Sequence, residues 1–200
     1  AGQVDRGDVG DANARARAEV LVPMLKAWAS GTGIEVASLG IQVHGGMGFV
    51  EETGAAQHWR DSRIAPIYEG TNGIQAADLV TRKLGLEDGE ALQKLFADIA
   101  RDASDEAQLK ALAGECAAIA KWMREDASLD DRLAGSVPFT AMCAVAVSGW
   151  ALLKQYEALG DAADSDRKHA KRVTMRFFLD HIVPEATGLK ASATAGAALL

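Results

Sequence analysis

The stretch with the clearest chemical potential in this 200-residue chain lies at residues 61–75, where a turn rich in proline and glycine delivers a carboxylate, Glu69. Immediately after it, apolar residues recur at steps of three and four. This spacing predicts an amphipathic helix whose first free N–H groups are capped by Thr71 or Asn72. Glu69 is therefore expected just outside a helix N-terminus.

Two roles are open for the Glu69 carboxylate. As a solvated charge near a helix N-terminus, it would be stabilised by the helix dipole, and position alone favours this role. In an apolar, water-poor pocket its pKa would instead rise, and it would become a competent base for proton abstraction. The neighbours favour the base: Ile67 and Tyr68 supply apolar and aromatic surface. Gly70 and Gly73 leave the backbone open to a flat group.

A second stretch of interest is the glycine-rich run that begins at Gly45 and Gly46. It follows an apolar helix predicted for residues 33–44 instead of a strand, and it lacks the lysine of a phosphate-binding P-loop. Taken alone, the run indicates a helix end at which the chain turns sharply. We expect the adjacent His44 to satisfy carbonyl groups at that helix end, and we assign it no catalytic role.

In the rest of the chain, apolar residues also recur at helical spacing, and no strand-like segment of any length is present. The predicted fold class is therefore all-α. Residues 1–12 are predicted to be a loop. A helix is predicted over about residues 13–30, with a kink at Pro23 unless its neighbours compensate. After a break at residues 31–33, a second helix is predicted over about 33–44. This second helix is apolar on nearly every side and is expected to be buried.

Beyond residue 86 the pattern predicts several bundle helices. Two amphipathic stripes are expected to be buried: Leu92, Leu95, Phe96 and Ile99, then Leu109, Leu112, Cys116, Ile119 and Met123. The charge-free stretch 137–153 is short for a membrane span and is interpreted as a central bundle helix that starts near Ser136 and Pro138. A last long helix over about 165–183 is expected to end at Pro184. Its predicted buried residues are Ala170, Val173, Phe177, Phe178 and Ile182.

The charge distribution changes near Leu86. The chain has a net charge of −7, and residues 87–131 alone carry 12 acidic and 5 basic side chains. We therefore predict two domains, residues 1–86 and residues 87–200. The overall acidity argues against nucleic-acid binding.

The two cysteines, Cys116 and Cys143, lie in apolar helical patterns and not in a ligand cluster. Neither a disulfide framework nor a metal site is predicted, and an intracellular, cytoplasmic location is the default expectation. The chain opens on Ala1 without an initiator methionine, and we interpret it as a piece of a longer protein.

Two motifs together resemble a known family. The first is Tyr68-Glu69-Gly70-Thr71, followed by Ile74-Gln75 and preceded by Arg60-Asp61; the second is Gln42-Val43-His44-Gly45-Gly46-Met47-Gly48-Phe49. In this order and spacing they resemble the C-terminal helical domain of acyl-CoA dehydrogenases. The resemblance covers about residues 14–86. The helical extension that follows resembles the subgroup that contains 3-(methylthio)propanoyl-CoA dehydrogenase.

The resemblance implies a reaction, a cofactor and partners. The reaction is α,β-dehydrogenation of an acyl-CoA thioester by FAD, with Glu69 as the base that removes the α-proton and with an electron-transfer flavoprotein as the electron acceptor. Family members carry an N-terminal helical domain and a β domain ahead of this segment, so the isolated chain is expected to be inactive.

The resemblance also implies roles for further residues. Gln42, Gly45 and Gly46 match positions that contact the ADP part of FAD bound mainly to a neighbouring subunit, which implies a homo-oligomer, a dimer or a tetramer. Thr71 matches a threonine that hydrogen-bonds the flavin. Tyr68 and Gly70 match positions beside the acyl chain and the thioester. One departure is Gly73, where many members have a glutamine that reaches FAD.

Two alternative functions remain. An acyl-CoA oxidase shares the base but passes electrons to oxygen. A non-catalytic, dehydrogenase-like module would use the same helices for interaction, and the intact motif around Glu69 argues against it.

Overall fold

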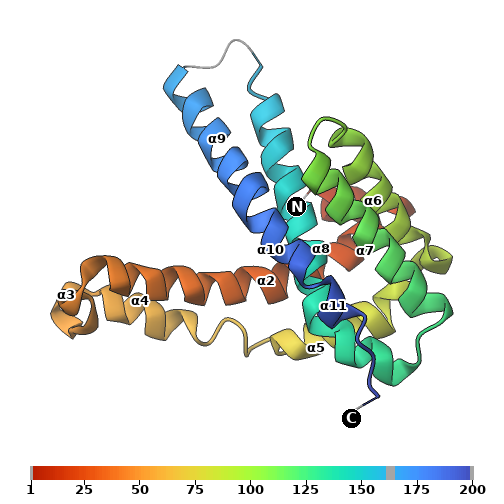
Figure 1. Ribbon diagram of the computed structural model, residues 1–200, viewed down its shortest axis with the longest axis horizontal. Coiled ribbons are helices and arrows are strands. Elements are labelled where there is room, and N and C mark those ends of the chain that lie inside the picture. The colour runs from red at the N-terminus through yellow and green to blue at the C-terminus, as the bar shows by residue number, and fades with distance from the viewer. Residues whose placement is uncertain (1, 161–164, 199–200) are drawn as a thin grey trace.

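The computed structural model describes residues 2–160 and 165–198, and all regular structure within them is helical, which confirms the all-α fold class (Figure 1). The helices in chain order are α1 Gly2–Asp8, α2 Ala12–His44, α3 Gly46–Phe49, η1 Glu51–Thr53, α4 Ala55–Ser62, α5 Asn72–Thr81, η2 Lys83–Gly89, α6 Glu90–Asp102, α7 Ala107–Glu125, α8 Leu129–Glu157, α9 Ser165–Phe177, η3 Phe178–Ile182, α10 Val183–Gly188 and α11 Lys190–Ala193.

Helix α2 is continuous over 33 residues, so the predicted break at residues 31–33 is wrong. Asp11 caps its start by accepting a hydrogen bond from the Ala14 N–H at 2.9 Å. Each glycine inside a helix costs about 1 kcal/mol relative to alanine. Contacts from another helix offset that cost here, because the Asn72 amide of α5 donates to the Ala27 carbonyl one turn before Gly31. The predicted loop at residues 1–12 is also wrong in part, since α1 occupies most of it.

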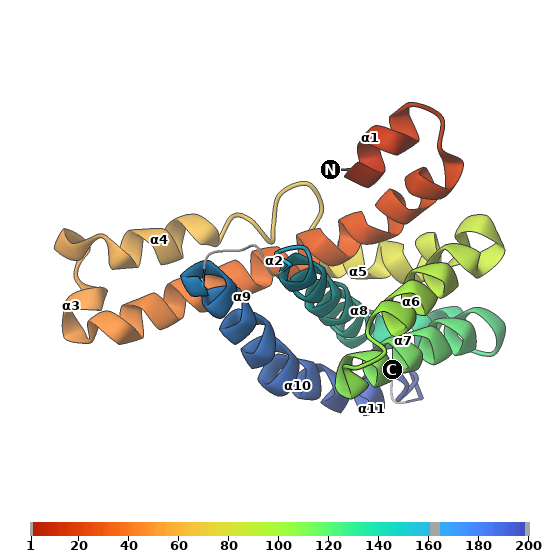
Figure 2. The same cartoon turned by 90° about the horizontal axis from the view of Figure 1, so that it is seen from above.

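The second half of α2 forms an arm with α3 and α4, and this arm extends away from the remaining helices (Figures 1 and 2). The predicted burial of residues 33–44 is wrong for this chain: Val36, Leu39 and Val43 are 61%, 62% and 86% exposed. Within the described residues these side chains are not covered, although Val36 lies at the edge of a surface pocket shared with α4. An apolar pattern predicts that a face needs a partner, but not which chain or domain supplies it.

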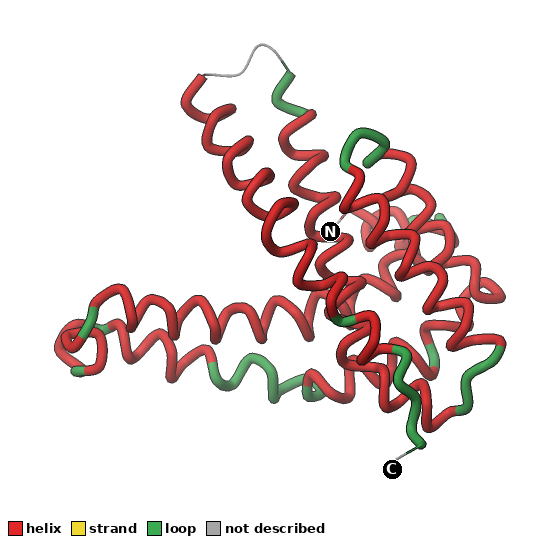
Figure 3. Tube along the Cα trace, viewed as in Figure 1, coloured by secondary structure: helices red, strands yellow, loops and turns green. Residues whose placement is uncertain are grey.

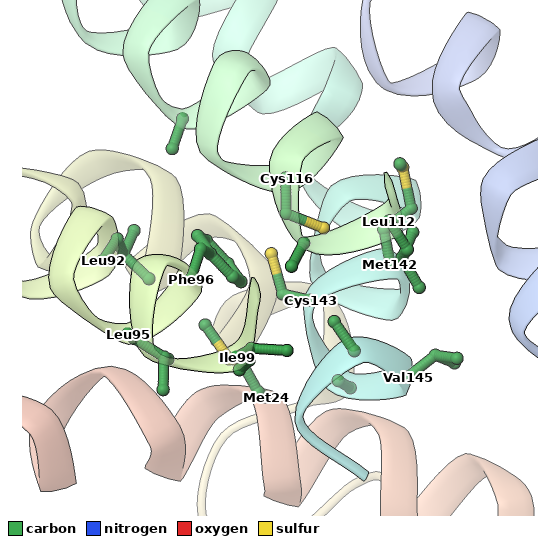
Figure 4. Close-up of a cluster of buried hydrophobic side chains, with 14 of the residues drawn as sticks. Met24, Leu92, Leu95, Phe96, Ile99, Leu112, Cys116, Met142, Cys143 and Val145 are labelled. Carbon is green, nitrogen blue, oxygen red and sulfur yellow. The ribbon is translucent and has the colours of Figure 1, made fainter. Parts of the chain in front are cut away.

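The core lies where the first half of α2 and helix α5 meet α6, α7 and α8. Both predicted stripes on α6 and α7 are buried, including Leu95, Ile99 and Leu112 at 0% exposure (Figure 4). Cys116 and Cys143 are buried in the same cluster with free thiols whose sulfur atoms point toward each other (Figure 4). Because burial disfavours the thiolate, and Cys116 adds to the effect, the pKa of Cys143 is raised well above its usual range.

Helix α8 begins at Leu129, earlier than predicted, because Ser128 and Asp131 form a capping box: each side chain accepts from the other residue's backbone N–H at 3.1 Å. Pro138 lies inside the helix and not at its start. By length and composition alone α8 could cross a membrane, but 56% of its most apolar stretch is buried inside the protein. This is the burial expected of a central bundle helix.

The last helical region differs from the predicted register. Helix α9 passes into the π-helical turn η3, and the chain stays helical through Pro184 into α10. The buried residues along this region are Met175 in α9, Leu179 in η3 and Val183 in α10. The predicted burial is wrong for three residues, Ala170, Val173 and Phe177, which are exposed.

Candidate functional site

The candidate site is built on the loop of residues 63–71 that joins α4 to α5, drawn as a green segment between the two red helices in Figure 3. Backbone hydrogen bonds make this loop a series of tight turns. The Ile67 N–H donates to the Ile64 carbonyl at 3.0 Å, and the Asn72 N–H donates to the Pro66 carbonyl at 3.1 Å. The loop is therefore closed on itself before it delivers Glu69 to the start of α5.

Glu69 adopts a left-handed backbone conformation with φ of 54°, and Gly70 follows with φ of 87°. A residue other than glycine is rarely found there, and such strain persists only where the surroundings enforce it. Two side chains do so. The Gln75 amide donates to the Glu69 carbonyl at 3.0 Å, and the Lys26 ammonium donates to the Gly70 carbonyl at 2.5 Å.

The N-terminus of α5 is fixed in the predicted way and tied to α2 in a way that was not predicted. Thr71 is the N-cap, and its hydroxyl oxygen accepts from the Ile74 N–H at 3.3 Å. The Asn72 side chain donates to the Ala27 carbonyl at 2.8 Å and accepts from the Ser30 hydroxyl at 2.9 Å. This cross-link sets the distance between the turn at Glu69 and the middle of α2.

The apolar pocket expected around Glu69 is not formed by this chain. Ile67 and Tyr68 are 56% and 53% exposed, and Glu69 is exposed as well. Within the described residues the Glu69 carboxylate makes no hydrogen bond or ion pair. Its backbone is thus held from both sides while its carboxylate oxygens stay free, and any surface that excludes water must come from outside these residues.

Charged and aromatic side chains contact one another along the preceding helix α4. Arg60 forms an ion pair with Glu51 at 3.3 Å, and the Arg63 guanidinium lies 5.9 Å from the centre of the Trp59 ring. Arg60, Glu51 and Arg63 are exposed, and Trp59 is 38% exposed. They orient the end of α4, from which the loop departs, and contribute little to stability.

The glycine-rich run ends α2 as predicted. Gly45 has φ of 62°, and its N–H donates to the Gln42 carbonyl at 3.0 Å. The Nδ1 atom of His44 lies 2.8 Å from the Gly40 carbonyl, which fits the helix-end role expected for it. A Cβ atom added at Gly45 or Gly46 would meet nothing within 4 Å. The backbone at these two glycines is therefore open to an outside group.

The two candidate stretches do not converge within one chain. Gln42 lies 16 residues after Lys26 on the same continuous helix, which corresponds to about 24 Å along the axis. The turn after Gln42 is at the far tip of the arm, whereas the loop that carries Glu69 returns toward the middle of α2 (Figure 1). Residues Glu69, Tyr68, Gly70 and Thr71 are brought together, and Gln42, Gly45 and Gly46 form a separate group.

Sequence reasoning missed Lys26 and Ser30. Both belong to an α2 stretch that looks like an ordinary amphipathic helix, and their partners are 42 to 46 residues further along the chain. The available signal was a lysine between Leu25 and Ala27, which a periodic pattern treats as a solvated position.

Comparison with known proteins places the chain in a family. Residues 7–84 match the family described as acyl-CoA dehydrogenase, C-terminal domain, and residues 90–200 match the family described as acetyl-CoA dehydrogenase C-terminal like. The chain belongs to the acyl-CoA dehydrogenase family. Both parts of this dehydrogenase-family chain are thus matched, including the helices that follow α5 and η2.

Three relatives illustrate the range of similarity. The chain is 39% identical to 3-methylmercaptopropionyl-CoA dehydrogenase of Ruegeria pomeroyi over 88% of its length, which is 33% of that relative. It is 25% identical to broad-specificity linear acyl-CoA dehydrogenase FadE5 of Mycobacterium tuberculosis over 86% of its length, or 32% of that relative. A butyryl-CoA dehydrogenase of Syntrophomonas wolfei is 42% identical over 38% of the chain and 13% of the relative. The chain spans about a third of the first two relatives.

Proposed function

We propose that this chain is the C-terminal part of an FAD-dependent acyl-CoA dehydrogenase and that Glu69 is the base that removes the α-proton of the acyl-CoA thioester. The family membership supports the reaction class. The observation that carries the assignment of the base is the left-handed backbone at Glu69, enforced by Gln75 and Lys26 while the carboxylate is left unbonded.

This arrangement suits a base that must act on a weak carbon acid. The α-proton of a thioester is far too weakly acidic for a carboxylate in water, so the oxygen must lie within hydrogen-bond reach of the proton and water must be excluded. A main chain fixed on both sides of Glu69 restricts where its carboxylate can go. Tyr68 and Gly70 would flank the acyl chain and the thioester, with the enclosing surface supplied from outside this chain.

The residues proposed to contact FAD fit such a group in their donor chemistry. Thr71 uses its hydroxyl oxygen as the acceptor for the Ile74 N–H, which leaves its O–H free to donate outward. The Gln42 side chain is exposed, and Gly45 and Gly46 present open backbone. FAD bound there would accept the β-hydride of the substrate.

The separation of the two groups bears on assembly. Thr71 lies at the start of α5 beside the middle of α2, whereas Gln42 lies near the far end of α2, so each would contact a different part of the cofactor or a different cofactor molecule. This supports the proposal of a homo-oligomer, a dimer or a tetramer, in which a site is completed by two copies. An electron-transfer flavoprotein is the proposed acceptor, and the cytoplasmic location stays a prediction.

The experiment uses the full-length protein that contains this chain, purified with its flavin. Butyryl-CoA, 3-methylmercaptopropionyl-CoA and longer straight-chain thioesters are offered with an artificial electron-accepting dye, and dye reduction and oxygen consumption are followed. We expect thioester-dependent dye reduction with little oxygen consumption. Rapid oxygen consumption would instead indicate an oxidase, and a protein that binds no flavin and reduces no dye would support the non-catalytic module.

A further inference from the structure

We infer that Lys26 is a positioning residue for the Glu69 turn: its ammonium group clamps the segment from Gly70 to Asn72 against α2 and thereby sets where the Glu69 carboxylate lies. The inference rests on the proposed function of Glu69 and adds a residue that neither family motif contains. It begins from two hydrogen bonds. The Lys26 Nζ atom donates to the Gly70 carbonyl at 2.5 Å and to the Asn72 side-chain oxygen at 3.1 Å.

These two acceptors lie on either side of Thr71, so a single ammonium group fixes both ends of the segment from Gly70 to Asn72. Ser30, one turn further along α2, donates to the same Asn72 oxygen at 2.9 Å, and the Asn72 amide returns a hydrogen bond to the Ala27 carbonyl at 2.8 Å. The four bonds tie one turn of α2 to the first residues of α5. Glu69 is the residue that immediately precedes the clamped segment.

The placement of the charge is not explained by helix stability. A cation is unfavourable near a helix N-terminus, because the dipole presents its positive end there. Lys26 nevertheless points its ammonium group at the start of α5, and within the described residues it has no carboxylate partner within 4 Å. Its side chain is half-buried, whereas the neighbouring Leu25 is exposed. Both of its acceptors belong to the segment that follows Glu69.

The clamp also explains how the turn keeps its shape without an enclosed pocket. Since Tyr68 and Glu69 are exposed in this chain, packing does not restrain them. Besides the backbone hydrogen bonds within the loop, the restraints are side-chain bonds to backbone carbonyls, from Gln75 on one side and from Lys26 on the other. Gln75 lies on α5 itself, so Lys26 is the side chain of α2 that holds a backbone carbonyl of the turn directly.

The test compares Lys26→Met and Lys26→Arg with a matched control, Lys110→Met, in the full-length flavoprotein. Lys110 lies on α7 and is exposed, and within the described residues its side chain makes no hydrogen bond or ion pair. Two quantities are measured: the rate of anaerobic flavin bleaching at saturating acyl-CoA together with the substrate Kd, and hydrogen exchange of the amides at residues 64–75.

We expect Lys26→Met to slow bleaching by about 100-fold, the scale of loss for a misplacement near 1 Å, while the substrate Kd changes less than about threefold. Lys26→Arg, which keeps the cation, should recover part of the rate. Amide exchange in the turn should rise in Lys26→Met and stay unchanged in Lys110→Met. A rate equal to that of wild type, or a loss of rate that Lys26→Arg does not relieve at all, would overturn the inference.

The two readouts separate the inference from the proposed function. If acyl-CoA does not bleach even the wild-type flavin, the proposed function fails. Amide hydrogen exchange at residues 64–75 then tests separately whether Lys26 positions the turn. Faster exchange confined to the turn in Lys26→Met would keep Lys26 as the residue that positions it. Unchanged exchange would remove that role.

Discussion

At the scale of single residues, two side-chain hydrogen bonds fix oxygen atoms of other residues. The Gln75 amide donates to the Glu69 carbonyl, and the Trp150 indole N–H donates to the Asp102 carboxylate at 3.0 Å. This hydrogen bond is the largest of the causes that lower the pKa of Asp102, and Arg101 and Lys154 lower that pKa further. The bond joins α8 to the end of α6.

Replacement of Trp150 by phenylalanine should therefore destabilise the protein in a pH-dependent way. A carboxylate whose pKa is lowered on folding contributes stability above its unfolded pKa of about 3.9, and the contribution is lost as the pH falls through the folded pKa. We expect Trp150→Phe to cost about 1.5 kcal/mol at pH 7 and much less at pH 3, measured by denaturant unfolding.

Trp122→Phe is the matched control for this prediction. Trp122 is also half-buried against the core, and within the described residues its indole donates no hydrogen bond. A loss of stability for Trp150→Phe that is the same at both pH values, or the same as for Trp122→Phe, would show that packing and not the bond to Asp102 is responsible.

At the scale of elements, the turn between α2 and α3 depends on one close backbone approach. Gly48 is buried, and a Cβ atom there would lie 2.3 Å from the Ile41 carbonyl oxygen and 2.9 Å from the His44 Cβ. Gly46, two residues earlier, has open space around it. The arm of α2, α3 and α4 lies away from the core, so such strain is expected to act locally.

We expect Gly48→Ala to cost about 1–3 kcal/mol of local stability, the range for overpacking, and to raise amide exchange at residues 45–53. Gly46→Ala should leave exchange there unchanged. The measurement is hydrogen exchange followed by mass spectrometry. Equal effects of the two substitutions would contradict the close approach as the cause.

The elements also show what the sequence could and could not predict. The buried faces of α6 and α7 were predicted correctly because they are regular amphipathic helices. The buried face of α9 was not, because Met175 and not Val173 or Phe177 faces the core, and the sequence offers apolar residues on both sides of this helix. The π turn at Phe178–Ile182 was not predicted either, because no propensity marks such a turn. The apolar pattern at Val36 and Val43 resembles that of a core helix, but both residues are exposed, because a pattern does not say whether the same chain covers the face.

In the candidate site, too, some features were predicted from the sequence and others were not. The cap at Thr71 and the helix end at Gly45 follow from local residue types, and both were predicted. The bonds of Lys26 to Gly70 and Asn72 join residues far apart in the chain, and such contacts cannot be read from periodicity. The roles of Glu69, Gln42 and the other assigned residues stay predictions.

At the scale of the whole molecule, one hydrophobic cluster continues across the division predicted at residue 86. Val20 and Met24 of α2 and Leu79 of α5 lie in the same buried cluster as residues of α6, α7 and α8. At the division itself, Glu87 and Asp88 have left-handed backbone conformations with φ of 52° and 55°, which turns the chain back toward α6. The connection is bent while the core around it is continuous.

A continuous core predicts cooperative unfolding of residues 1–200. Helicity from circular dichroism and tryptophan fluorescence should report the same midpoint in a urea titration. Leu79→Ala in α5 and Leu95→Ala in α6 should each lower the free energy of unfolding by about 2–5 kcal/mol. Each substitution should therefore lower the urea midpoint reported by both probes. Two separated transitions, each moved by only one substitution, would show that 1–86 and 87–200 unfold independently.

Anaerobic bleaching of the flavin band in the full-length protein, compared between wild type and Glu69→Gln, tests whether Glu69 is the base. We expect a thioester substrate to bleach the wild type, and we expect Glu69→Gln to retain FAD but to bleach at least about 100-fold more slowly, the lower end of the loss of a general base. If Glu69→Gln bleached at the wild-type rate, Glu69 would not be the base.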